Sequence, residues 1–228
     1  MKQKPIAAFA LTVCCSVAHA GKLYDGYDSF YADQAGQVFP SPVSNDYLPA
    51  TYGPNGDTTA SWEGQVGKMR IKLTVTGRSV RINNRVHRLA DAVRSNGDNR
   101  VDLDPRSVTL YLASDAGTTG PAICIESTGT GSGTADRYSQ VYAISTQSRS
   151  GIRLFKLPSL FGSCRSLVRQ QGALRFPIFS YRREPNIDDP VGTEVQYAEI
   201  EGTQYTSTGQ RLTTRFTDPT NVFRFTVE

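Results

Sequence analysis

The chain has 228 residues, of which 38% are hydrophobic and 20% are charged, and it carries a formal net charge of +4. Residues 1–20 contribute two lysines and no acid, so residues 21–228 carry a net charge of only +2. Nucleic-acid-binding domains usually concentrate a clear basic excess on one face, whereas here lysine and arginine interleave with aspartate and glutamate. We therefore expect no nucleic acid as a partner, and a single larger all-β domain suits this length.

Residues 1–20 contain the parts of an export signal in the expected order. Lys2 and Lys4 give a positively charged start, residues 6–17 form an apolar stretch, and a small-x-small cleavage site ends at Ala20. The apolar stretch is well short of the roughly 20 residues that a bilayer-spanning helix needs, and no second apolar run follows it. The sequence predicts a periplasmic or secreted protein that is cleaved after Ala20 and does not span the membrane afterwards.

A lipoprotein leader is the alternative interpretation of this segment, because Cys14 follows Leu11, Thr12 and Val13. The residue before the cysteine of such a leader is normally small, and Val13 is larger and branched, so we expect no lipidation at Cys14. The form of the signal and the absence of any Asn-x-Ser/Thr acceptor site indicate a bacterial envelope protein.

Cleavage after Ala20 removes Cys14 and Cys15 and leaves Cys124 and Cys164 as the only cysteines. Exported proteins meet an oxidising compartment, and a single remaining pair predicts one disulfide bond. The chain-entropy model gives a loop of this size about 4 kcal/mol of stabilisation. No Cys-x-x-Cys spacing is present, so the sequence does not indicate redox catalysis.

Residues 21–61 are rich in Tyr, Pro, Gly, Asp and Ser and show no apolar period of 2 or 3.6 residues. We interpret them as an irregular N-terminal arm that either lies across the domain through its tyrosines or is partly disordered. The all-β domain is predicted to cover residues 62–228. The tyrosines of the arm are Tyr24, Tyr27, Tyr31, Tyr47 and Tyr52.

The first clear strand covers residues 69–75, where apolar and polar side chains alternate with the period of a half-buried strand. A turn at residues 77–79 leads into a second short apolar run at residues 80–82, which predicts a hairpin. Apolar residues at helical spacing between 86 and 93 predict one short helix near 86–93.

The rest of the chain predicts short strands separated by turn residues. Such spacing predicts a single antiparallel β-sandwich or open barrel of roughly 8–10 strands. Cys124 lies in one predicted strand and Cys164 follows an apolar turn at residues 157–161, so the predicted disulfide would pin that turn to the sheet. The strands are expected at residues 108–112, 122–126, 138–144, 152–157, 174–181, 195–200, 211–216 and 222–227.

No catalytic set is recognisable, and we expect neither an enzyme nor a cofactor. His87 is the only histidine in residues 21–228, between Arg85 and Arg88, with no adjacent acid to orient it. Catalytic zinc sites usually use two or three histidines, and a Ser-His-Asp triad needs an orienting acid. The glycine-rich loop at residues 129–134 lacks the lysine of a phosphate-binding loop and precedes a predicted strand, so we interpret it as a connection.

Two acidic clusters are candidate binding sites, at residues 98–104 and 186–201. The first lacks the glycine and the distant glutamate of an EF-hand loop. In the second, Tyr197, Glu199 and Glu201 lie on one face of a predicted strand. That arrangement fits a sugar site or a strand edge protected by charge, and these three residues are the speculative ligand contacts.

The sequence leaves three functional hypotheses open. The leading one is a non-enzymatic envelope domain that binds another envelope or secreted protein, as an inhibitor or an immunity-like protein, with the tyrosines of residues 21–61 as contact area. The second is a carbohydrate-binding or weakly glycan-cleaving domain. The third is an assembly or structural factor of a surface structure, whose arm adds a strand to a neighbouring sheet.

Overall fold

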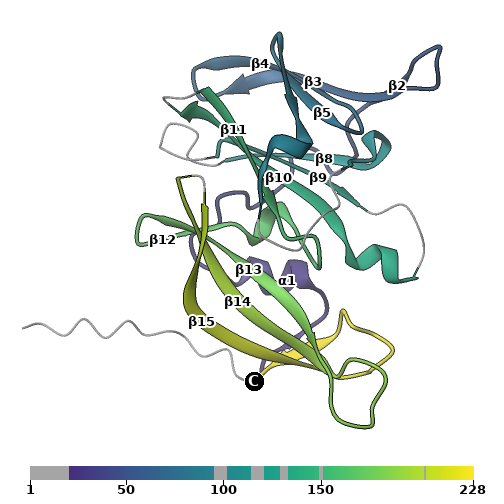
Figure 1. The fold of residues 1–228 in the computed structure, drawn as a ribbon, viewed down its shortest axis with the longest axis vertical. Helices are drawn as coiled ribbons and strands as arrows, with labels where there is room; N and C mark the ends of the chain where they lie inside the picture. The colour runs from purple at the N-terminus through teal and green to yellow at the C-terminus, as the bar shows by residue number, and fades with distance from the viewer. Residues whose placement is uncertain (1–20, 95–101, 114–120, 129–132, 149–150, 203) are drawn as a thin grey trace, which may run out of the picture.

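The strands form three sheets stacked along the long axis of the molecule, named here the upper, middle and lower sheets (Figure 1). The structure is a computed structural model that describes residues 21–94, 102–113, 121–128, 133–148, 151–202 and 204–228. It confirms the predicted all-β, sandwich-like fold and adds a third layer to the two that a simple sandwich contains.

The upper sheet is a five-stranded antiparallel meander in which each strand pairs with the next in sequence. In β4 and β5 every second side chain is apolar and buried, as a half-buried strand requires. Its strands are β2 (Ala50–Tyr52), β3 (Thr58–Val66), β4 (Met69–Val75), β5 (Ser79–Ile82) and β6 (Arg85–Arg88).

The middle sheet has the order β7-β11-β10-β9-β8 and is antiparallel except for the short parallel pair of β7 and β11. Its strands are β7 (Val93–Arg94), β8 (Val108–Leu112), β9 (Ile123–Thr128), β10 (Ser139–Ser148) and β11 (Gly151–Leu157). Both faces are covered, because Ile125 and Ile144 face the upper sheet while Cys124 and Ala143 face the lower one.

The lower sheet has the order β1-β16-β15-β14-β13-β12. The hydroxyl of Tyr205 joins it to the middle sheet by donating to the carbonyls of Val93 and Lys156, at 3.0 and 2.9 Å. Its strands are β1 (Leu23–Tyr24), β12 (Val168–Gln170), β13 (Ala173–Arg182), β14 (Gly192–Glu201), β15 (Gln204–Phe216) and β16 (Phe225–Val227).

Helical segments are short throughout the described residues. The α-helix α1 (Tyr27–Ala32) lies beside the lower sheet (Figure 1). The 3₁₀ turns are η1 (Leu89–Asp91), η2 (Pro105–Ser107), η3 (Gly133–Arg137) and η4 (Cys164–Ser166).

Residues 21–61 supply β1, α1, β2 and the start of β3. Tyr24, Tyr27 and Tyr31 are buried in an aromatic cluster on the lower sheet. The ring of Tyr27 stacks on Phe161 with centroids 3.9 Å apart, and the hydroxyl of Tyr31 donates to the Phe161 carbonyl at 2.5 Å. The segment therefore packs across the sheets through these tyrosines as part of the core.

The helix expected near 86–93 is wrong. The chain there forms β6, the 3₁₀ turn η1 and β7. Asn83 adopts a left-handed conformation with φ 52° in the two-residue turn between β5 and β6, which is the conformation that tight hairpins need. The hairpin leaves Val86 54% exposed, so the apolar spacing of this stretch does not mark one buried face.

The predicted disulfide between Cys124 and Cys164 is present, with Cα atoms 5.9 Å apart. Cys124 is in β9, and Cys164 begins η4 just after the apolar turn that contains Phe161. Phe161 has φ 52°, and its N–H donates to the Arg137 carbonyl at 2.7 Å. The disulfide thus pins this turn to the middle sheet, as the sequence predicts.

Candidate functional site

The outer face of the upper sheet carries four exposed cations, Arg70, Lys72, Arg81 and Arg88, which we call the basic face. Arg70 and Lys72 alternate with buried residues along β4. Thr74 faces outward beside Lys72 and pairs with Arg81, which brings β5 to the same face. Side chains directly opposite in an antiparallel pair share a face, so the hairpin register gathers these cations from three strands.

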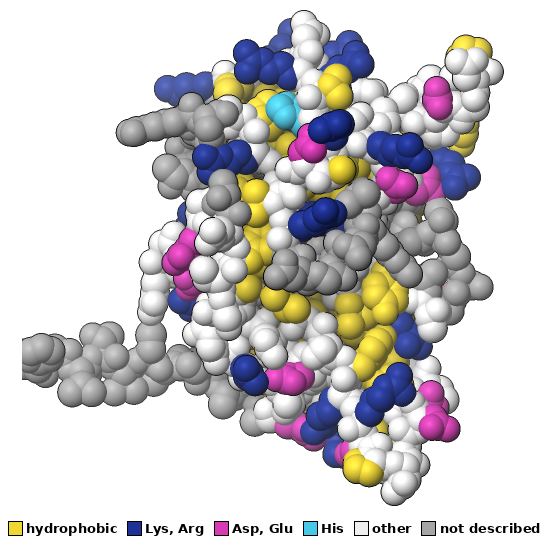
Figure 2. Space-filling view, viewed as in Figure 1, with side chains coloured by type: hydrophobic (Ala, Val, Ile, Leu, Met, Phe, Trp, Pro, Cys, Tyr) yellow, Lys and Arg dark blue, Asp and Glu magenta, His cyan; other side chains and the backbone are white. Residues whose placement is uncertain are grey.

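Positive and negative charges are unevenly distributed along the chain, although the net charge is small. Residues 58–94, which form β3 to β7, contain eight lysines and arginines but only two acids, a net charge of +6. Residues 21–228 together carry +2, so the remainder of that range carries −4. Figure 2 shows lysine and arginine gathered over the end of the molecule that the upper sheet builds. The overall composition conceals this polarity.

Local acids neutralise only part of the basic face. Arg70 pairs with Glu63 at 2.7 Å, and Arg88 pairs with Asp91 at 2.9 Å. These pairs are exposed to solvent, where ion pairs contribute little stability. Among the described residues, no acid is recorded in an ion pair with Lys72 or Arg81. Glu63 also lies directly opposite Lys72 on this face. The four cations nevertheless outnumber Glu63 and Asp91, so the face keeps a net positive charge for an anionic partner.

A groove of about 450 Å³ lies beside β6, between the upper and middle sheets. Val86, His87 and Arg88 line one side, and Ile152, Arg153 and Leu154 of β11 line the other. Asp91 and Val93 complete the lining. His87 lies opposite Val80 and so points toward the inner face of the upper sheet. Its Nε2 atom is buried and has no hydrogen-bond partner among the described residues.

The three speculative ligand contacts do not meet around a cavity. The ring of Tyr197 is buried in the aromatic cluster, its hydroxyl accepts a hydrogen bond from Gln34 at 3.3 Å, and burial raises its pKa to about 12. Glu199 pairs with Arg175 at 2.6 Å. Glu201 is exposed at the end of β14. Tyr197 and Glu199 are therefore engaged within the chain.

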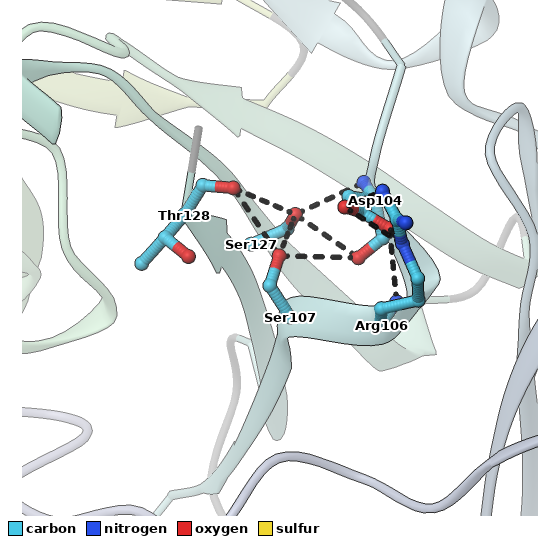
Figure 3. Close-up of polar contacts among 5 residues, drawn as sticks. All are labelled: Asp104, Arg106, Ser107, Ser127 and Thr128. Carbon is cyan, nitrogen blue, oxygen red and sulfur yellow. Dashed lines mark hydrogen bonds and ion pairs between the residues drawn. The ribbon is translucent and has the colours of Figure 1, made fainter. Parts of the chain in front are cut away.

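The acidic cluster at residues 98–104 is only partly described, since Asp98 lies outside the described residues. Asp104 is the N-cap of η2 and accepts hydrogen bonds from the backbone and guanidinium of Arg106, which lowers its pKa (Figure 3).

Figure 3 shows how two serines join this cap to β9. The Asp104 N–H donates to the Ser127 hydroxyl at 3.0 Å, and the hydroxyls of Ser107 and Ser127 are 2.9 Å apart. These bonds hold the turn against the middle sheet, which is a structural role for Asp104.

A largely buried carboxylate that the sequence analysis missed lies next to the disulfide. Glu126 accepts hydrogen bonds from the hydroxyls of Tyr111 (2.7 Å) and Ser163 (3.1 Å) and from the N–H of Cys164 (2.7 Å). Burial raises the pKa of Glu126 despite these three donors. Every donor belongs to the chain itself, so this cluster serves to hold the turn at Cys164 on β9.

The remaining candidates add no site. Most of the glycine-rich loop at residues 129–134 lies outside the described residues. In the part of the chain that the structure describes, no three His, Cys, Asp or Glu side chains come together as metal ligands. No helix in that part is long and apolar enough to cross a membrane.

Comparisons of the chain with models of protein families, with curated proteins and with solved structures gave no match.

Proposed function

We propose that this chain is an exported, non-enzymatic β domain that binds an acidic surface of another envelope or secreted protein, in the manner of an inhibitor or immunity-like protein. The observation that carries the proposal is the basic face, where Lys72 and Arg81 have no recorded ion-pair partner among the described residues. Complementary charge across an interface speeds association and rejects wrong partners.

The composition and shape of this surface support a protein partner. Three of its four cations are arginines, which are enriched at protein interfaces and bind carboxylates with two parallel hydrogen bonds. The side chain of Val86 projects beside Arg81 on the same face and adds an apolar contact. The contrast between the net charge of +6 on residues 58–94 and that of −4 on the rest of residues 21–228 would also orient the domain toward its partner.

The contacts among the described residues give less support to the other two hypotheses. A sugar site at Tyr197 and Glu199 would require a buried ring and a paired carboxylate to become available. An assembly factor that donates its arm would have to release β1 and β2, which pair with β16 and β3 of the same chain. The tyrosines that remain exposed in residues 21–61 are Tyr47 and Tyr52.

The test is an affinity pull-down from envelope extract with three forms of the C-terminally tagged, exported protein. The reversal variant carries Lys72→Glu and Arg81→Glu, and the matched control carries Lys72→Arg and Arg81→Lys, which keep both charges at the same positions. Because both side chains are exposed on one sheet face, all three forms are expected to fold alike, and thermal unfolding checks this.

A partner retained by the wild type and the control, and lost by the reversal variant, supports the proposal. A partner retained equally by all three forms overturns the assignment of the basic face. If no form retains a protein and the wild type instead binds envelope polysaccharide, the carbohydrate hypothesis replaces it.

A further inference from the structure

β6 is the outermost strand of the upper sheet, so one of its edges has no neighbouring strand among the described residues. The Leu89 N–H donates to the Arg78 carbonyl at 3.0 Å, which sets the hydrogen-bonding phase of the β5–β6 ladder. Antiparallel ladders alternate between bonded and non-bonded pairs. His87 therefore pairs with Val80 through hydrogen bonds, and the backbone groups of Val86 and Arg88 point toward the open edge.

The groove runs along this open edge and offers two kinds of contact. Its apolar wall contains Val86, Ile152 and the buried Leu154, and its polar side contains His87, Arg88 and Arg153. A side chain lying in this groove would therefore meet both apolar area and the polar side chains of His87, Arg88 and Arg153.

We propose that an extended, acidic segment of the partner protein adds to β6 as a further strand and places one side chain in the groove between β6 and β11. This inference rests on the proposed function and deepens it by naming the docking mode. Strand addition takes its affinity from main-chain hydrogen bonds and its specificity from pockets for alternate side chains. Here the open edge at Val86 and Arg88 supplies the main-chain hydrogen-bonding groups, and the groove beside it supplies the pocket for a side chain.

Charge selects this occupant over a second copy of the chain. Arg85 and Arg88 lie on the edge strand, and Arg153 lines the opposite wall of the groove. Asp91, which pairs with Arg88, is the acid among the groove's lining residues, so the three cations outnumber it. Cations on an edge strand repel an identical edge and so prevent pairing between copies. The same cations attract a strand that carries carboxylates.

The binding test uses three capped peptides that differ in charge or in the ability to pair as a strand. The probe is Ac-EVEVEVE-NH2, the charge control is Ac-KVKVKVK-NH2, and the strand control is Ac-EVEPEVE-NH2, whose proline cannot donate a ladder hydrogen bond. Because His87 is the only histidine in residues 21–228, its imidazole signals in the NMR spectrum of the exported protein report on the groove without overlap.

At millimolar concentration the acidic probe should shift the His87 imidazole signals and slow amide exchange at Val86 and Arg88 by about tenfold. The lysine peptide should do neither, and the proline peptide should bind more weakly. Equal binding of the two acidic peptides would mean attraction by charge alone and would overturn strand addition. The absence of any change with the acidic probe would also overturn it.

A variant separates this inference from the proposed function. Val86→Pro removes an N–H that points to the open edge while leaving the bonds between Val80 and His87, and Val86→Thr is its control with that N–H retained. Thermal unfolding checks that both variants are folded. If Val86→Pro binds the captured partner as tightly as Val86→Thr while the reversal of Lys72 and Arg81 abolishes binding, strand addition is wrong and the proposed function stands.

Discussion

The carboxylate of Glu126 accepts a hydrogen bond from the backbone N–H of Cys164 at 2.7 Å, and so joins the same two segments as the disulfide between Cys124 and Cys164. Glu126 is two residues from Cys124 on β9, so the covalent and polar links lie side by side. Together they hold the turn at residues 157–164, and Phe161 at its tip stacks on Tyr27. The turn therefore links the middle sheet to the aromatic cluster.

Replacing Glu126 should show how much its hydrogen bonds contribute to the free energy of unfolding. Glu126→Ala leaves the Cys164 N–H without its acceptor in a largely buried place, which should cost about 1–3 kcal/mol in the free energy of unfolding. Glu126→Gln keeps an oxygen for this N–H and should cost less. Urea unfolding of both variants measures the difference, and equal losses would contradict the assignment of the N–H bond as the main contact.

The pH dependence of the free energy of unfolding also tests the role of the Glu126 carboxyl group. Burial raises the folded-state pKa of Glu126 above its ordinary value of 4.5, so its contribution to stability is present in full below that pH and is lost as the pH rises through the folded pKa. The stability of wild type relative to Glu126→Gln should therefore fall as the pH rises above 4.5. Asp104 has a lowered pKa and acts in the opposite direction, but it is common to both proteins and cancels in the difference. A constant difference across this range would contradict the raised pKa.

Removing the disulfide should lower stability substantially. Its cysteines are 40 residues apart, and the chain-entropy model assigns such a loop about 4 kcal/mol. A Cys124→Ser and Cys164→Ser double variant should show this loss in urea unfolding. Intact mass with thiol labelling should find both thiols blocked in exported protein before reduction and both labelled after it. Two free thiols in the exported protein would refute the bond.

The tyrosines of residues 21–61 should divide sharply between core and surface. Tyr27 is buried and contacts Phe161 and Phe225 with centroids 3.9 and 4.7 Å away, so Tyr27→Ala should cost about 3–5 kcal/mol. Tyr52 is 69% exposed, so Tyr52→Ala should change stability by less than about 0.5 kcal/mol. Thermal or urea unfolding measures both, and a small effect at Tyr27 would contradict its place in the core.

Strands that alternate cleanly were predictable from the sequence. The boundaries of β4 and β8 match the predicted ranges 69–75 and 108–112, because each buries every second side chain or a nearly continuous apolar run. β3 was missed because Gly64 and several polar residues interrupt its inward pattern of Ala60, Trp62 and Val66. Residues 86–93 were assigned wrongly because apolar spacing alone does not distinguish a helix from a strand followed by a 3₁₀ turn.

The basic face was missed in the sequence analysis for a different reason. Net charge summed over residues 21–228 averages the +6 of residues 58–94 against the −4 of the remainder. The alternation of Arg70 and Lys72 with buried residues, combined with the predicted hairpin, contained the signal for the basic face. Glu126 had no such signal, because its partners Tyr111 and Ser163 become neighbours only when β8 and the turn pack against β9.

The most direct test of the account is the dissociation constant of the captured partner, measured by isothermal titration calorimetry for the wild type and two variants. Reversal of Lys72 and Arg81 to glutamate should weaken binding by at least about tenfold, and the charge-preserving Lys72→Arg and Arg81→Lys variant should stay within about twofold of the wild type. Equal affinity of the reversal variant and the wild type would contradict the basic face as the binding surface.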